Sequence, residues 1–302
     1  MEFTLPELAN ILVDAHCTRS VQEDVYLENF APIEEANAKS VSWIRGADEE
    51  AIKKVADSQA LVILASKDFP FDNSAVKNKI FFLCDNPRLS YSRIVRAAQK
   101  LTQKWEIHPT AIIHPEAKIS DKVSIGPYTS IGKATIGEQT IIDGHCFIHD
   151  NVEIGKRVHL HSQVCIGSDG FSFEWNEKGE IEKLPHIGKC IIEDDVEIYP
   201  FANVDRGTLG KVRIGRGTKI DHYVHVGHNC TVGQNTIVTA GVVMCGGSHI
   251  GDNVWIGVHT TIKEKCIVGS HSLIGLNSLV TKNVPKNEVW IGSPAKFLKK
   301  NN

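Results

Sequence analysis

The sequence predicts a mainly β protein in which a small N-terminal α/β domain precedes a long parallel β-helix. Aliphatic residues recur every six positions from Ile107 to Val280, and a glycine often follows them. The first hundred residues lack this period and contain helical and strand-like segments instead. A period of six fits neither a helix nor an isolated strand. It fits a β-helix in which each hexad forms one short face and one corner, and three hexads form a coil of about 18 residues.

Residues 1–102 are expected to form the small α/β domain, with a role in recognising a nucleotide or substrate. Thr4 is a suitable cap for a helix that has Pro6 in its first turn. The apolar runs 60–64 and 79–84 predict short buried strands. Residues 88–105 have the spacing of an amphipathic helix, which we expect to lead into the second domain.

The hexad pattern predicts a β-helix over residues 103–290, followed by a short basic tail, 291–302. Its first run, with a slip of one residue after Ile131, is Ile107, Ile113, Ile119, Ile125, Ile131, Ile136, Ile142, Ile148, Ile154, Leu160 and Ile166. From Ile214 to Val280 the period is unbroken.

Two interruptions break the hexad pattern. The step from Ile166 to Ile187 is too long for one hexad, so residues 170–186 should leave the coil as a loop, with a hairpin tip at Asn176–Gly179. A shorter disturbance falls at 205–213. Loops that leave a rigid solenoid are frequent binding regions, although a surface insertion without a role is the alternative.

Composition excludes several classes of protein. Apolar residues make up 42% of the 302 residues and the formal net charge is −3, so we expect an ordinary globular protein without a nucleic-acid partner. The aliphatic runs are too short to form a transmembrane segment, and the acidic N-terminus does not resemble a secretory signal. The eight cysteines form no CxxC pair, which favours free thiols and a cytoplasmic location.

Three histidines within DHYVHVGHN (221–229) raise the question of a metal site. His222 and His228 occupy the same position in successive hexads, so they should lie on faces about 120° apart, and His225 occupies another position. They therefore cannot converge on one metal within a single chain. Zinc shared between subunits, as in hexapeptide-repeat carbonic anhydrases, would require a histidine pair five residues apart, which the sequence lacks. We expect no metal.

His228 has the most specific surroundings of the three. Gly246 follows 18 residues later and should stack beside His228 on the next coil. A glycine there leaves an open groove and an amide N–H that could bind an oxyanion, while imidazole is a common general base near neutral pH. The alternative is a corner histidine that hydrogen-bonds a neighbouring coil, and spacing alone does not decide between the two.

Several segments resemble the UDP-3-O-acylglucosamine N-acyltransferases of lipid A biosynthesis, within the hexapeptide-repeat acyltransferases. They are SDGFSF (168–173), VDRGTL (204–209), KIDHYVHVGHN (219–229), AGVVMCGG (240–247) and LVTK (279–282). The resemblance covers nearly the full chain and implies that the coils wind left-handed. It further implies a homotrimer with active sites between subunits, which moves a 3-hydroxyacyl chain from acyl carrier protein to the amine of a UDP-glucosamine-type sugar.

The resemblance also implies roles for particular residues. His228 matches the family's catalytic base, and Gly246 matches the glycine whose backbone N–H holds the oxyanion. Asp221 and His222 match an Asp-Asn pair beside the catalytic histidine, with His222 in place of the asparagine. No metal, redox group or other tightly bound cofactor is expected.

Two departures from the family concern substrate binding. The family's second histidine, two coils along, corresponds to Lys265, which could hold a phosphate or an oxyanion. Trp43 matches the aromatic residue that holds uracil, but Gly46–Glu49 replaces the usual Asn- and Tyr-containing segment. Core packing is the alternative role of Trp43.

The C-terminus supports a second interpretation. The sequence 292–296, GSPAK, followed by further lysines, resembles the end of coenzyme A-dependent sugar acetyltransferases. There Lys296, Lys299 and Lys300 would contact nucleotide phosphates, or else lie in a solvated tail. The alternative functions are therefore acetyl-coenzyme A-dependent N-acetylation of a nucleotide-linked amino sugar for O-antigen or capsule, and a non-catalytic trimeric β-helix scaffold.

Overall fold

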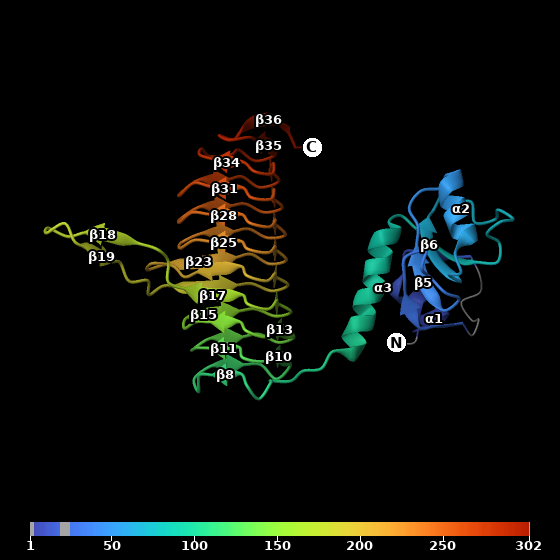
Figure 1. The fold of residues 1–302 in the computed structure, drawn as a ribbon, viewed down its shortest axis with the longest axis horizontal. Helices are drawn as coiled ribbons and strands as arrows, with labels where there is room; N and C mark the ends of the chain where they lie inside the picture. Colours follow the sequence, from blue (N-terminus) through green and yellow to red (C-terminus); the bar gives the residue numbers. More distant parts are fainter. Residues whose placement is uncertain (1–2, 19–24, 302) are drawn as a thin grey trace. The chain divides into compact units, whose positions relative to one another are not determined.

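A computed structural model describes residues 3–18 and 25–301 and divides the chain into two units, Met1–Gln103 and Lys104–Asn302 (Figure 1). The first unit contains a five-stranded sheet of order β2-β7-β6-β5-β4 and a separate β1-β3 pair. Its strands are β1 (Phe3–Thr4), β2 (His16–Cys17), β3 (Tyr26–Leu27), β4 (Asn29–Phe30), β5 (Ser40–Trp43), β6 (Val62–Ser66) and β7 (Ile80–Cys84). Its helices are α1 (Leu5–Ile11), α2 (Glu49–Asp57) and α3 (Pro87–Thr102).

Strands β4 to β7 are parallel, and helices cover both faces of their sheet. Alternate residues of β6 explain the layers: Val62 and Leu64 pack with α1 and α3, whereas Ile63 and Ala65 pack with α2. Thr4 caps α1 through a capping box with Glu7, as its sequence predicts. None of the helices in the described part of the chain is long and apolar enough to cross a bilayer.

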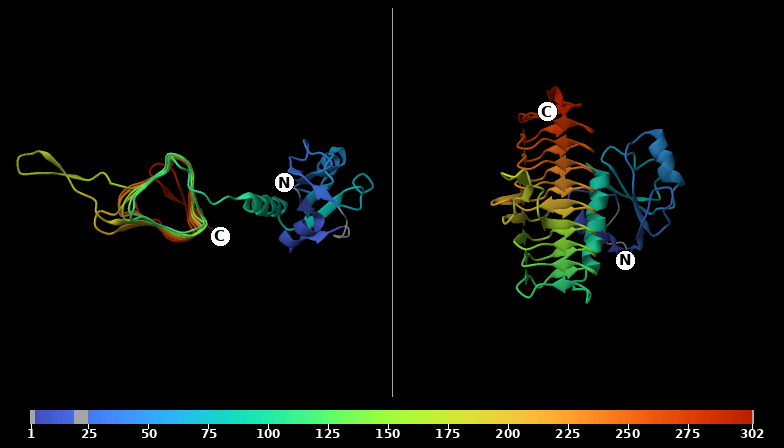
Figure 2. Two further views of the ribbon diagram at one scale, coloured as in Figure 1. Left: turned by 90° about the horizontal axis from the view of Figure 1, so that it is seen from below. Right: turned by 60° about the vertical axis from the view of Figure 1, so that its left-hand side comes forward.

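The second unit is a β-helix with three sheets, parallel except for the last strand of the first sheet, and its end-on view is triangular (Figure 2). The first sheet consists of β10 (Val123–Ile125), β13 (Thr140–Ile142), β16 (His159–Leu160), β21 (Glu197–Ile198), β24 (Lys219–Ile220), β27 (Ile237–Val238), β30 (Trp255–Ile256), β33 (Leu273–Ile274), β35 (Glu288–Ile291) and β36 (Lys296–Lys300). The second consists of β8 (Ile112–Ile113), β11 (Ser130–Ile131), β14 (Phe147–Ile148), β17 (Cys165–Ser168), β22 (Asn203–Asp205), β25 (His225–Val226), β28 (Val243–Met244), β31 (Thr261–Ile262) and β34 (Leu279–Val280). The third consists of β9 (Lys118–Ile119), β12 (Thr135–Ile136), β15 (Val152–Ile154), β20 (Lys189–Ile192), β23 (Lys211–Ile214), β26 (Thr231–Val232), β29 (His249–Ile250) and β32 (Ile267–Val268).

The aliphatic hexad positions from Ile113 onward form the interior of the β-helix, which confirms the predicted fold class. Ile107 and Ile187 are exposed, and the core resumes after the hairpin at Cys190 and Ile192. The strands of the coils point aliphatic residues inward, as β25 does with Val226, and successive coils stack these residues into one continuous core. The slip in the pattern does not disturb the core, because Ile131 and Ile136 are both buried. Corner residues such as Asn235 and Asn253 have positive φ angles of 51° and 54°, a conformation that asparagine and glycine adopt more readily than other residues.

The predicted interruptions leave the coil as two excursions. Strands β18 (Phe173–Trp175) and β19 (Ile181–Lys183) pair antiparallel as a projecting hairpin (Figure 1). Its tip lies at Asn176–Gly179, where the Gly179 N–H donates to the Asn176 carbonyl, so the predicted hairpin is confirmed. The second excursion, within 205–213, returns to the coil at β23 and packs its Gly207 against Gly188.

The basic C-terminal segment forms a strand rather than a free tail. Strand β36 (Lys296–Lys300) turns back antiparallel on β35 and extends the first sheet. Lys300 forms an ion pair with the Glu288 carboxylate at 2.7 Å, which connects the end of β36 to β35. Lys296 and Lys299 remain exposed on β36.

Candidate functional site

His228 and Gly246 lie at the same corner of successive coils, as their 18-residue spacing predicts. Strands β25 and β28 pair with Val226 beside Met244, and each strand leads into a turn two residues later. A Cβ atom on Gly246 would lie only 2.6 Å from Cε1 of the His228 ring. The imidazole therefore occupies space that exists because residue 246 has no side chain.

Three segments surround the half-buried His228 ring. The Ser172 hydroxyl, at the base of the hairpin, lies 3.4 Å from Nε2. On the other side of the ring, the Thr208 hydroxyl of the second excursion lies 3.5 Å from Nδ1, and the Asn229 amide nitrogen lies 3.3 Å from it. These distances are long for hydrogen bonds, so packing largely holds the ring and leaves both nitrogens available to a ligand.

His186, which the sequence analysis did not identify, is the second histidine of this site. Its ring is buried, with 4% exposure, and its centroid lies 5.2 Å from that of His228. Nδ1 lies 3.0 Å from the Leu184 carbonyl, but Nε2 is buried without a hydrogen-bond partner in the described structure. A Cβ on Gly170 would come within 2.8 Å of both His186 Nε2 and His228 Cβ, so this glycine lets the hairpin base approach the two histidines.

The surroundings of His228 favour its neutral form. Burial lowers the pKa of His228 below its usual 6.5, His186 acts in the same direction, and Asp205 opposes both. A neutral imidazole at pH 7 can accept a proton, which a general base must do.

An open groove of about 630 Å³ runs beside the site. It is lined by Thr208, Leu209, Gly210, Lys211, Asn229, Gly247, His249 and Lys265. Lys265 occupies a corner with φ of 59° and lies over Gly247, one coil beyond it. Since Lys211 and Lys265 both border the groove, an anionic ligand would be favoured there.

Asp221 and His222 form a separate pair on another corner. Asp221 Oδ1 lies 2.7 Å from His222 Nδ1 and accepts the His222 backbone N–H at 2.8 Å. The His222 ring approaches Tyr199, with ring centroids 5.3 Å apart. His225 faces Asn203 instead. The three histidines of DHYVHVGHN therefore have different neighbours, as the hexad register predicts.

Trp43 belongs to the first unit. It ends β5, pairs in register with Leu64 of β6, and packs half-buried against the core that α1 and α3 cover. Gly46, three residues later, has a φ of 88° and turns the chain toward α2.

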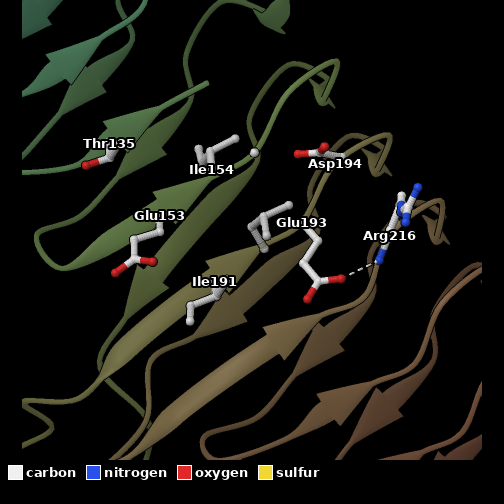
Figure 3. A pocket seen from close by; sticks show the side chains of 9 residues that line it. Thr135, Glu153, Ile154, Ile191, Glu193, Asp194 and Arg216 are labelled. Atoms are coloured by element: carbon white, nitrogen blue, oxygen red, sulfur yellow. Dashed lines mark hydrogen bonds between the residues drawn. The ribbon is translucent and has the colours of Figure 1, made fainter. Parts of the chain in front are cut away.

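A second hollow of about 570 Å³ lies on the third sheet, around Glu153, Glu193 and Asp194 (Figure 3). Glu193 accepts the backbone N–H of Arg216 at 2.9 Å and pairs with Arg213, while Glu153 pairs with Lys189 at 2.7 Å. The hollow contains none of the predicted site residues. Because ion pairs account for two of its carboxylates, we assign it no function.

Comparisons with known proteins agree with this fold. Residues 211–246 match the model for the bacterial transferase hexapeptide (six repeats). A UDP-3-O-acylglucosamine N-acyltransferase of Wolinella succinogenes is 37% identical over 155 residues, which are 49% of each chain, so the match spans about half the length of that relative. A protein of the same name from Campylobacter lari is 32% identical over 284 residues, covering 90% of this chain and 88% of that one. The crystal structure of the UDP-N-acetylglucosamine O-acyltransferase of Moraxella catarrhalis superposes with a TM-score of 0.59 at 29% identity, over 65% of this chain and 75% of that one.

Proposed function

The chain belongs to the UDP-3-O-acylglucosamine N-acyltransferase family, and we propose that it transfers a 3-hydroxyacyl group from a phosphopantetheine thioester to the amine of a UDP-glucosamine-type sugar in lipid A biosynthesis. The observation that carries this proposal is the half-buried His228 imidazole stacked on Gly246 beside an open groove. A base, an amide donor and room for an extended donor substrate then lie together.

His228 acts as the general base in this proposal. In the tautomer that carries its proton on Nδ1, Nε2 accepts a proton from the sugar amine as the amine nitrogen attacks the thioester carbonyl. The new C–N bond produces a tetrahedral oxyanion. Collapse of this intermediate breaks the C–S bond, and the thiolate leaves with the proton that His228 returns.

Gly246 supplies the oxyanion donor. Within the described residues, its backbone N–H has no hydrogen-bond acceptor in the protein, so it is available to the developing negative charge. The reaction requires no metal or tightly bound cofactor. Exclusion of water around His228 by the hairpin base would strengthen the hydrogen bond from the Gly246 N–H to the oxyanion.

The remaining predicted residues would bind the substrates. Lys265 suits a phosphate of the donor because it borders the groove next to Gly247. Asp221 and His222 would contact the sugar nucleotide, and Trp43 would stack on its base. We further propose that the enzyme is a homotrimer whose sites lie between subunits, and that it works in the cytoplasm, where its free cysteines remain reduced.

A panel of donors and acceptors tests the proposal. The purified chain is incubated with 3-hydroxyacyl carrier protein or acetyl-coenzyme A and several amino-sugar nucleotides, and products are measured by mass spectrometry. We expect transfer from the acyl carrier protein, and a decrease of about 100-fold or more in His228→Ala. The control is His259→Ala, which removes an exposed histidine at another corner.

The other outcomes separate the alternatives. Transfer from acetyl-coenzyme A alone would support the N-acetyltransferase interpretation. Absence of transfer with every donor would support the scaffold interpretation. Unchanged acylation by His228→Ala would contradict the assignment of the base.

A further inference from the structure

A second cluster of histidines and carboxylates lies where β13 and β16 pair, away from His228. We propose that Asp143, His159 and His161 bind one transition-metal ion of the Zn²⁺ class between two neighbouring coils. These three residues offer donor atoms that all lie within 4.8 Å of one another. The site is independent of the proposed acyl transfer.

The fold itself brings the three side chains together. Ile142 pairs with Leu160, and both point into the core. The residues beside these two therefore face outward: Asp143 and His161 stack at the corner, and His159 precedes it on β16. A His-x-His pair on one coil thus faces a carboxylate on the previous coil.

The nitrogen-to-carboxylate distances within the cluster match those between ligands of a tetrahedral metal. His159 Nε2 lies 3.3 Å from both oxygens of Asp143, and His161 Nδ1 lies 3.5 Å from Asp143 Oδ2. These values exceed the usual 2.7–3.2 Å of an N–H···O hydrogen bond. Ligand atoms about 2.0–2.1 Å from a tetrahedral zinc lie about 3.3–3.4 Å apart, which is close to these nitrogen-to-oxygen distances.

A carboxylate behind His161 provides a separate observation. Glu197, from the next coil, lies 3.1 Å from His161 Nε2, so each nitrogen of this ring faces a carboxylate. Histidines that bind metal through one nitrogen commonly donate the other N–H to a carboxylate, which fixes the tautomer. Tyr199 stacks on the same ring at 4.3 Å and restricts its rotation.

The donor set defines the kind of ion. Two imidazole nitrogens and one carboxylate suit Zn²⁺, Co²⁺ or Ni²⁺ rather than Mg²⁺ or Ca²⁺, which prefer oxygen ligands. The donor side chains are 22–35% exposed, so solvent can supply a fourth ligand. The sequence expectation of no metal rested on His222, His225 and His228, and it did not consider donors on different coils.

Zinc titration of the full-length, tag-free chain after removal of metals by EDTA tests this proposal. We expect one tightly bound Zn²⁺ per chain, at least 100-fold weaker binding in Asp143→Asn and His159→Gln, and about tenfold weaker binding in Glu197→Gln. His145→Gln is the matched control, because this nearby histidine stacks on Tyr128 outside the cluster. It should bind like the wild type.

Two further measurements make the result decisive. Zn²⁺ should raise the melting temperature of the wild type but not of His159→Gln, whose melting temperature in EDTA shows whether it is folded. Co²⁺ should give the absorption of a tetrahedral site without a cysteine-to-cobalt charge-transfer band. Equal zinc binding by the wild type and the folded His159→Gln, or a cysteine-to-cobalt band, would overturn the proposal. The same conclusion would follow if the wild type bound no Zn²⁺, since His161 would then only bridge two carboxylates.

Discussion

At the scale of single residues, the space at Gly246 determines where the His228 ring can lie. In Gly246→Ala the new Cβ would fall 2.6 Å from Cε1 of that ring, so the imidazole must rotate away. Because the new Cβ meets a half-exposed side chain and not rigid backbone, we expect kcat to fall about 100-fold with little change in melting temperature. Steady-state kinetics and thermal unfolding measure the two effects.

Gly137→Ala is the matched control for this prediction. Its Cβ would lie 2.6 Å from the backbone of Gly155, where no side chain can move aside. We expect it to lower the melting temperature and leave kcat near the wild-type value. If Gly246→Ala instead lowered the melting temperature and left kcat unchanged, Gly246 would have only a structural role.

The pH dependence of the reaction should reflect the low pKa of His228. Only the neutral imidazole accepts a proton, so kcat/KM should rise with pH through the His228 pKa, which lies below 6.5, and then remain level. His186 helps to lower this pKa, so His186→Gln should move the rising limb to higher pH. The variant would therefore lose activity relative to the wild type on the acidic side of its profile and match it on the alkaline plateau. A limb that stays in place or moves to lower pH would contradict this effect of His186.

The residues that sequence could and could not predict differ in a physical way. His228 and Gly246 belong to a regular repeat, so counting 18 residues brings them together. His186 is the last residue of an excursion whose path no period describes, and its approach to His228 depends on Gly170. The unpartnered Nε2 of His186 becomes apparent only from packing.

At the scale of the element, buried threonines connect the coils of the β-helix. The Thr236 hydroxyl donates to the Gly251 carbonyl at 2.9 Å and accepts the Val254 N–H at 3.1 Å. We expect Thr236→Val to lower the free energy of unfolding by about 1–3 kcal/mol, because it leaves these two backbone groups buried without partners. Chemical denaturation measures the loss, and Thr236→Ser should retain most of the stability. Equal destabilisation by both variants would show that the methyl group, not the hydroxyl, matters.

The interruption of the six-residue period predicted where the projecting hairpin lies, but not its direction. An insertion into closely stacked coils has to leave the coil, so the position and tip of β18 and β19 followed from the sequence. The direction of the hairpin and its exposed Phe171 and Trp175, 89% and 73% accessible, did not. Apolar side chains so exposed on an arm suit contact with another protein surface, which agrees with the proposed trimer.

At the scale of the whole molecule, the two units have separate cores. The β-helix core contains only residues from the second unit, and both clusters of the first unit lie within its own sheet and helices. The division between Gln103 and Lys104 falls where the six-residue period begins. Sequence could locate this change because a solenoid and a helix-covered sheet bury apolar residues with different periods.

Because its core is complete, residues 104–302 should fold without the first unit. We expect this fragment to retain the β-sheet signal in circular dichroism and to unfold cooperatively, since each coil is stabilised by its neighbours. If the first unit binds the nucleotide through Trp43, the fragment should show at least a tenfold higher KM for the sugar nucleotide, while KM for the acyl donor stays within twofold. Trp43→Ala in the full chain should give the same split, and Trp43→Phe should largely restore binding. A folded fragment with unchanged KM for the sugar nucleotide would remove the first unit from substrate recognition.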